Sequence, residues 1–257
     1  MKNKKRLEGK VAIVIGGNGD IGGAIACGLC NEGAIVVPTG RKKTSVKAIV
    51  NILAHNGNIW TEPLCTDITR EEQLNRLCKK VLKRYGRIDI LVNASGVYLN
   101  KPAVKVTKKE WNAIIDTNLS GVFSACRIIG AIMLTQKRGS IINIGSIGSF
   151  VALSNTAAYS VSKAGLVSLS KSLSAEWASR GVRVNTIIPG VFPTRLNKKA
   201  LQLKGRKENI IRGIPMKRMG KLHELVGASI FLASDESQYV TGISLPVDGG
   251  FLSFSGY

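Results

Sequence analysis

Tyr159 and Lys163 are the two residues whose types and spacing point most directly to chemistry. They stand four residues apart in A-A-Y-S-V-S-K-A-G-L-V-S-L-S-K-S-L, and a helix there would place both side chains on one face. A neighbouring ammonium group favours the phenolate and lowers a tyrosine pKa toward the range of general acid/base catalysis. Because an isolated pair at this spacing is usually an ordinary feature of a helix surface, its meaning depends on the rest of the chain.

Ser146 precedes Tyr159 by thirteen residues and ends the segment S-I-I-N-I-G-S, which predicts a buried strand. In doubly wound parallel sheets, ligands bind beyond the carboxyl ends of the strands. We therefore expect the Ser146 hydroxyl to hold a substrate oxygen close to Tyr159.

A glycine-rich turn follows the β-branched run V-A-I-V-I at 11–15. It reads G-x-G-x-x-G at Gly17, Gly19 and Gly22 and leads into a segment with helical periodicity. Glycines in this strand, turn and helix context let backbone amides approach a pyrophosphate, and the helix N-terminus adds partial positive charge. The turn therefore predicts dinucleotide binding.

The next predicted strand, A-I-V-V-P, closes in T-G-R-K-K, where a dinucleotide fold contacts the adenosine ribose. NAD-preferring sites commonly carry an acidic residue there that bonds both ribose hydroxyls. This chain has Gly40 followed by the cations Arg41, Lys42 and Lys43. The pattern favours NADP(H) over NAD(H), the alternative being a solvated basic turn.

Further apolar runs predict strands ending near Asp67, Asn93 and Pro189, and a last one before Gly249. Amphipathic helices separate them, one of them closed by Gly86. No repeat or linker divides the 257 residues. The fold class is α/β, a Rossmann-type doubly wound parallel sheet of about seven strands with helices on both faces, in a single domain over 1–257.

The composition of the chain limits which ligands and partners are expected. The formal charge of +21 is dispersed along the chain and attracts anions in general, including a phosphorylated coenzyme, carboxylated substrates or an acidic carrier protein. No nucleic-acid motif accompanies it, so no specific nucleic-acid binding is expected. Five scattered cysteines and two isolated histidines predict neither a disulfide framework nor a metal site. With no secretory signal and no long uncharged apolar run, we expect a cytoplasmic protein that does not span a membrane.

Together these residues resemble the short-chain dehydrogenase/reductase family, over essentially the whole chain. The matching motifs are the glycine turn, D-I at 67, N-A-S-G at 93, Asn118, Ser146, Y-x-x-x-K at 159, P-G-V-F-P-T at 189 and V-T-G-x-x-x-x-V-D-G-G at 240. The resemblance implies that Tyr159 is the general acid/base and that Lys163 lowers its pKa and binds the nicotinamide ribose. It implies that Ser146 orients the carbonyl and that Asn118 supports a proton-relay water. The coenzyme residues that it implies, besides Tyr159 and Lys163, are Gly16, Asn18, Gly19, Asp20, Ile21, Arg41, Asp67, Ile68, Asn93, Gly96, Ile188, Pro189, Gly190 and Thr194.

The glycine turn departs from the usual family pattern. T-G-x-x-x-G-x-G would place Thr at 15 and Gly at 20, where this chain has Ile15 and Asp20. We expect Gly19 to provide the close approach to the pyrophosphate. Asp20 brings negative charge near phosphate unless it caps the following helix. Asn18 stands where NADP-using members often carry a cation.

The segment 191–219 is rich in Lys, Arg and Gly and is expected to form a mobile substrate lid of short helices. Its V-F-P-T-R-L-N and R-G-I-P-M-K-R-M-G most resemble gluconate 5-dehydrogenases and related enzymes of sugar acids. The expected reaction is hydride transfer between a ketone and a secondary alcohol of a small sugar acid or polyol, with Arg195 binding a substrate carboxylate. The alternative for Arg195 is a side chain directed to solvent.

Two other functions stay open. One is a 3-oxoacyl-[acyl-carrier-protein] reductase, because Lys137, Arg138 and Arg180 resemble the basic rim that such enzymes use for their acidic carrier. The other is a non-enzymatic module that senses or binds the coenzyme. Loss of Tyr159 or Lys163 would favour the second, and both residues are present. The family resemblance also implies a homotetramer.

Overall fold

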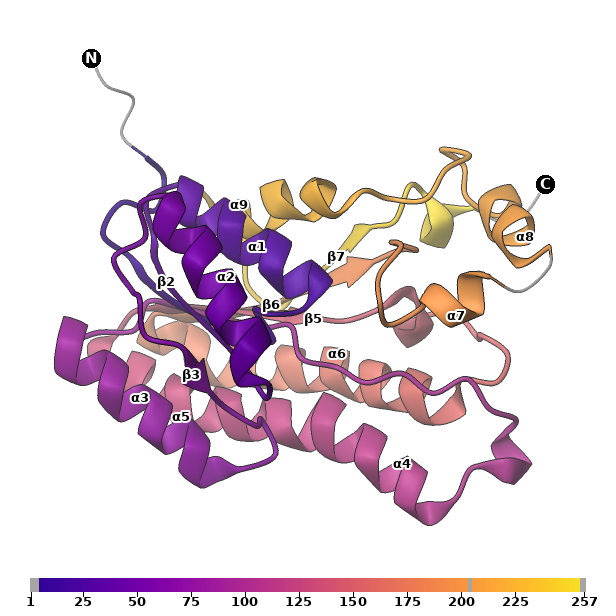
Figure 1. Cartoon of the computed structure of the whole chain (residues 1–257), viewed down its shortest axis with the longest axis horizontal. Coiled ribbons are helices and arrows are strands. Elements are labelled where there is room, and N and C mark those ends of the chain that lie inside the picture. The colour runs from indigo at the N-terminus through magenta and orange to yellow at the C-terminus, as the bar shows by residue number, and fades with distance from the viewer. Residues whose placement is uncertain (1–4, 203–204, 255–257) are drawn as a thin grey trace.

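Seven parallel strands form one sheet in the computed structural model, which describes residues 5–202 and 205–254 (Figure 1). The strands are β1 (Val11–Ile15), β2 (Ile35–Gly40), β3 (Leu64–Cys65), β4 (Ile90–Asn93), β5 (Gly139–Ile144), β6 (Val182–Pro189) and β7 (Ser244–Val247). Their spatial order is β3-β2-β1-β4-β5-β6-β7. The chain therefore winds outward from β1 in one direction and then, from β4, in the other. This is the predicted doubly wound arrangement, with its switch point between β1 and β4.

The central strands are short because their sequences are short continuous β-branched runs. V-A-I-V-I in β1 and I-L-V-N in β4 are buried along their whole length. Parallel strands covered on both faces favour such runs over alternating patterns. In the register, Ile15 of β1 lies beside Asn93 of β4, so the segments that follow both strands leave the sheet next to each other.

Helices cover both faces of the sheet (Figure 1). On one side lie α1 (Asp20–Asn31), α2 (Lys43–His55) and α9 (Val226–Ala233); on the other lie α3 (Glu71–Tyr85), α4 (Lys108–Ile115), α5 (Gly121–Gln136) and α6 (Ala157–Trp177). Two short helices, α7 (Lys198–Leu201) and α8 (Arg206–Arg212), lie beyond the strand ends, within the segment predicted to form the lid.

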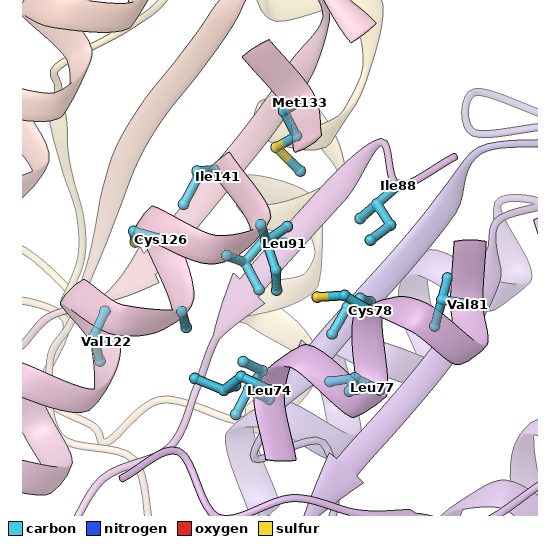
Figure 2. Close-up of a cluster of buried hydrophobic side chains, with 14 of the residues drawn as sticks. Leu74, Leu77, Cys78, Val81, Ile88, Leu91, Val122, Cys126, Met133 and Ile141 are labelled. Atoms are coloured by element: carbon cyan, nitrogen blue, oxygen red, sulfur yellow. The ribbon is translucent and has the colours of Figure 1, made fainter. Parts of the chain in front are cut away.

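The core has one large apolar cluster on each face of the sheet. Figure 2 shows the cluster where α3 and α5 meet the sheet. There Leu74 and Leu77 of α3 face Leu91 of β4, and Met133 of α5 completes the layer. Full burial of a side chain of this size contributes about 1.5–3 kcal/mol. The cluster therefore holds the strand ends, and the residues after them, in fixed positions.

Two elements differ from the sequence prediction. The strand expected to end at Asp67 consists of two residues, Leu64 and Cys65, at the edge of the sheet. Pro63 precedes it and has no N–H to donate to a ladder, which limits pairing there. The predicted helix around Asn118 contains a π-helical turn, Asp116–Ser120.

The helical run Lys108–Gln136, made of α4, the π-helical turn and α5, is long and apolar enough to cross a membrane by length and composition alone. In the fold, its apolar side chains Val122, Ile129 and Met133 belong to the core cluster against the sheet. This is the position of a core helix.

Candidate active site

A cleft opens at the carboxyl ends of β1, β4, β5 and β6. Its walls come from the glycine turn, the segment after β4, the end of β5, the start of α6 and the lid segment. Doubly wound sheets bind ligands in this position, next to the switch point. The cleft is therefore the candidate active site.

Ser146 and Tyr159 meet in this cleft. Ser146 follows β5, and its Oγ accepts a hydrogen bond from the Gly148 amide at 3.1 Å, which fixes the side chain. Tyr159, from the first turn of α6, is hydrogen-bonded to Ser146. The ring of Tyr98 packs edge-on against the Tyr159 ring, with centroids 5.0 Å apart. The phenol thus has a fixed direction toward the serine hydroxyl.

Lys163 lies one turn further along α6 and is 4 % exposed. Its Nζ donates to the Ile144 carbonyl oxygen at 2.7 Å and lies 5.9 Å from the centre of the Tyr159 ring. Burial lowers the pKa of Lys163 from 10.5 to about 8. Burial has the opposite effect on Tyr159 and raises its pKa. The hydrogen bond to Ser146 lowers this pKa by a smaller amount, and Tyr98 raises it further. Desolvation is the largest cause of the Tyr159 shift, and Lys163 is not among its causes, so the lowering by Lys163 stays a prediction.

Asn118 lies in the π-helical turn and is fully buried. Its Oδ1 accepts from the Val97 amide at 2.8 Å, and its Nδ2 donates to the Val97 carbonyl oxygen at 2.9 Å and to Ser162 Oγ at 3.1 Å. The side chain therefore clamps the segment after β4 to α6, beside Lys163. Single π turns inside α-helices often occur at functional sites. The proton-relay water stays a prediction.

The glycine turn is a tight backbone cradle. Gly16 has φ +81°, and a Cβ there would lie 2.6 Å from the Ser95 amide nitrogen. A Cβ on Gly22 would lie 2.2 Å from the Gly16 carbonyl oxygen. Gly19 is the N-cap of α1 and provides no side-chain cap. Close backbone packing with bare amides at a helix N-terminus fits the pyrophosphate of a dinucleotide.

Asn18 occupies the space beside Gly40. A Cβ on Gly40 would lie 2.0 Å from Asn18 Oδ1, while Asn18 Nδ2 donates to Ser45 Oγ at 2.9 Å. Lys42 and Ser45 line this end of the cleft. Arg41 is exposed and is not part of the cleft wall. The cation that the structure places here is therefore Lys42 rather than Arg41.

Asp67, Ile68 and Asn93 are among the predicted coenzyme residues that do not line the cleft. Asp67 Oδ1 accepts from Thr69 N and Thr69 Oγ1. Ile68 is 4 % exposed and belongs to the core. The Asn93 amide donates to Asn143 Oδ1 at 2.8 Å inside the core. Successive side chains along a strand point to opposite faces of the sheet, and the Asn93 side chain points into the core. The segment that follows Asn93, including Gly96, forms this part of the cleft wall.

The nicotinamide end of the predicted site is formed by the end of β6. Pro189, Gly190 and Thr194 line the cleft, whereas Ile188 is buried beneath it. A Cβ on Gly190 would lie 2.6 Å from the Asp248 Cα, so the backbone must pass here without a side chain.

Arg195 is bound to the glycine turn. Its Nε donates to Asp20 Oδ1 at 2.8 Å, its backbone N–H to Asp20 Oδ2 at 2.7 Å, and one terminal nitrogen to the Asn18 carbonyl oxygen at 3.1 Å. The sequence predicted a substrate carboxylate as its partner. The structure instead gives it the carboxylate of Asp20, because the lid segment folds back over the turn. Asp20 is in the first turn of α1, whose N-cap is Gly19, and its side chain does not cap the helix.

Several wall residues carry no sequence motif. Tyr98, Leu153, Arg206, Ile210 and Phe251 line the cleft, from the segment after β4, the segment before α6, the lid and the C-terminal region. Only the fold brings them together, so no spacing in the sequence could single them out.

The three cations considered for binding an acyl carrier protein lie at the amino ends of the strands, opposite the cleft. Lys137 and Arg138 immediately precede β5, and Arg180 precedes β6. Arg138 also lies 3.4 Å from Asp89 Oδ1. Because β6 is eight residues long, about 26 Å of strand separates this end from the cleft. They do not form a rim around the cleft of their own chain.

The fold and the site define an α/β oxidoreductase that binds a nicotinamide coenzyme. A family model described as Enoyl-(Acyl carrier protein) reductase matches residues 17–252. The 3-oxoacyl-[acyl-carrier-protein] reductase of Thermotoga maritima is 35 % identical over 247 residues, covering 96 % of this chain and 99 % of the relative. The D-threitol dehydrogenase of Mycolicibacterium smegmatis is 37 % identical over 246 residues, covering 96 % and 94 %.

Solved structures agree. A gluconate 5-dehydrogenase from Burkholderia cenocepacia, in complex with NADP and tartrate, has a TM-score of 0.93 at 32 % identity, covering 98 % of both chains. A xylitol dehydrogenase bound to NAD⁺ has a TM-score of 0.90 at 27 % identity, covering 96 % of this chain and all of the other. The chain belongs to the short-chain dehydrogenase/reductase family. The fold and the reaction class inferred from the sequence are thereby confirmed.

Proposed function

We propose that this oxidoreductase uses NADP(H) to interconvert a ketone and a secondary alcohol in a small sugar acid or polyol. The observation that carries the proposal is the convergence of Ser146, Tyr159 and Lys163 in one cleft that continues to the glycine turn. This convergence also argues against a purely binding role, because a sensor needs no oriented proton donor.

Different residues along the cleft would bind the coenzyme, hold the carbonyl oxygen and transfer the proton. The glycine turn, Gly96 and Lys42 would hold the coenzyme, which supplies or accepts the hydride when bound. Ser146 holds the carbonyl oxygen through its fixed hydroxyl. Tyr159 gives its proton to that oxygen during reduction and takes it back during oxidation. The raised Tyr159 pKa keeps the phenol in the protonated form that the reduction requires.

The coenzyme choice rests on the ribose end. Gly40 leaves no carboxylate to bond the ribose hydroxyls, and Lys42 supplies a cation for a 2′-phosphate. The NADP bound in the gluconate 5-dehydrogenase structure supports the same choice.

The substrate class rests on Arg206. This side chain lines the cleft from the start of α8, and no carboxylate among the described residues lies within salt-bridge distance of it. A cation with unused donors inside a cleft suits a substrate carboxylate. We therefore assign to Arg206 the role that the sequence suggested for Arg195. The relatives that act on gluconate and D-threitol support this class.

Reduction of a 3-oxoacyl thioester is the second candidate, favoured by the apolar part of the wall. Leu153, Leu196, Leu201, Ile210 and Phe251 would suit an acyl chain. A carrier docked on Lys137 and Arg180 would have to serve the cleft of another subunit, since its own lies across the sheet. We carry over the homotetramer from the family resemblance and the cytoplasmic location from the composition of the sequence.

A coenzyme-oxidation panel decides between the two candidates. Purified enzyme would be assayed with 5-keto sugar acids, neutral keto sugars and acetoacetyl thioesters at equal concentration. Arg206→Ala should lower kcat/KM for the acids by about 10- to 150-fold and spare the neutral ketones. Arg212→Ala, at an exposed α8 cation outside the cleft wall, is the matched control. A thioester preferred more than about tenfold over the sugar acids would reverse the ranking.

A further inference from the structure

Asp20 and Arg195 form an ion pair across the cleft wall, 175 residues apart in the chain. Both Asp20 oxygens accept from Arg195, one from the guanidinium and one from the backbone amide. The same guanidinium also donates to the Asn18 carbonyl oxygen. Three contacts thus fix the first residues of the lid segment to the glycine turn.

The position of Asp20 makes the pair more than a surface contact. Asp20 is the first residue of α1, whose N-terminus is where this fold binds a pyrophosphate. Its side chain is only 24 % exposed and belongs to the cleft wall. An unpaired carboxylate at that point would repel a pyrophosphate through a partly desolvated medium.

We propose that Arg195 is a coenzyme-positioning residue: Asp20 holds its guanidinium at the pyrophosphate end of the cleft, where it cancels the carboxylate charge and leaves donors for the phosphates. Nε is used by Asp20 and one terminal nitrogen by Asn18, whereas the other terminal nitrogen has no protein acceptor among the described residues. The inference rests on the coenzyme use proposed above and is independent of the substrate.

The pair also couples the coenzyme to the lid. Arg195 follows Thr194, whose amide and hydroxyl both donate to Asn197 Oδ1 at the start of the lid helices. Any phosphate that binds Arg195 therefore stabilises the segment that covers the substrate end. Coenzyme binding and the position of the lid segment are linked in this way.

A double-mutant cycle on coenzyme binding tests the proposal without turnover. Equilibrium titration of NADPH by its fluorescence would be measured for wild type, Arg195→Ala, Asp20→Gly and the double variant. Arg195→Ala should raise the NADPH Kd by about 10- to 150-fold, because it loses donors and leaves the Asp20 charge unpaired. The double variant should recover at least about tenfold of that loss, since no carboxylate remains to repel the pyrophosphate. Arg212→Ala is the control for removing one lid cation.

Two results would overturn the proposal. One is an unchanged NADPH Kd in Arg195→Ala with a raised KM for acidic substrates, which would return Arg195 to the substrate. The other is additivity of the two single variants, which would show that Asp20 and Arg195 act separately. Circular dichroism and thermal melting of each variant separate either result from misfolding. Failure of the substrate proposal would leave this readout unaffected, because only coenzyme is titrated.

Discussion

Lys163 and Tyr159 share one face of α6, yet the lysine Nζ donates to the Ile144 carbonyl oxygen and lies 5.9 Å from the centre of the tyrosine ring. The ammonium is therefore anchored to the end of β5, beside the Tyr159 ring. Both groups are desolvated, and their pKa values move in opposite directions, Tyr159 upward from 10.0 and Lys163 downward to about 8.

Tyr159→Phe should lower the single-turnover rate of hydride transfer by about 100- to 10,000-fold, because it removes the proton donor and keeps the ring. NADPH affinity should stay within about threefold of wild type. Tyr98→Phe is the matched control, since that ring packs on Tyr159 and its hydroxyl accepts its one hydrogen bond among the described residues from Asn100 Nδ2, at 3.3 Å. Stopped-flow measurement with a saturating ketone gives the rate. A Tyr159→Phe rate within threefold of wild type would exclude Tyr159 as the acid/base.

Lys163→Met should inactivate the enzyme and raise the unfolding free energy of the coenzyme-free protein by about 1 to 3 kcal/mol at pH 7. The folded state binds the Lys163 proton less tightly than the unfolded chain, since burial lowers the pKa to about 8. The free-energy cost of burying the charged ammonium is therefore full below pH 8, and it disappears as the pH rises toward 10.5. The difference between variant and wild type should shrink over the same range. Urea titrations at pH 7 and 9.5 measure it; a constant difference would mean that Lys163 is not desolvated.

Gly40→Asp by itself should weaken binding of both coenzymes, because its Cβ would lie 2.0 Å from Asn18 Oδ1. Combining it with Asn18→Ala frees that space, so the new carboxylate can accept from the ribose hydroxyls and repel a 2′-phosphate. The double variant should then prefer NADH over NADPH by about tenfold. Titrations with both coenzymes check the order, with Asn18→Ala as control. Unaltered NADPH preference in the double variant would place the ribose elsewhere.

Cys78 and Cys126 should resist thiol reagents at pH 8 in the native protein. Burial raises the pKa of each thiol to about 12, and both lie in the core cluster of Figure 2. Only the thiolate reacts. Cys27 and Cys65, which are partly exposed, serve as internal controls. Peptide mass spectrometry after brief alkylation identifies the modified sites, and rapid labelling of Cys126 would reveal opening between α5 and the sheet.

The fold class and the candidate residues for the chemistry could be predicted from local patterns in the chain. Buried β-branched runs, a glycine turn and a Tyr and Lys four residues apart are local patterns, and each has one dominant physical explanation in its context. The structure has the doubly wound sheet that these patterns predict, and it brings Ser146, Tyr159 and Lys163 together in the cleft. Asp67 and Asn93 were predicted at the coenzyme but do not line the cleft. The direction of a side chain at the end of a strand depends on the pleat of the strand and on the path of the following loop.

Which groups meet depends on the three-dimensional packing of the chain. Arg195 pairs with Asp20 across 175 residues, Asn18 fills the space beside Gly40, and Arg206 faces the cleft from the lid. No spacing in the chain encodes these contacts, because they depend on how the lid segment folds back over the sheet. The pKa values were decided in the same way. Sequence shows that a cation stands near a phenol, but the balance between its charge and the loss of water depends on burial, which only the packed chain defines.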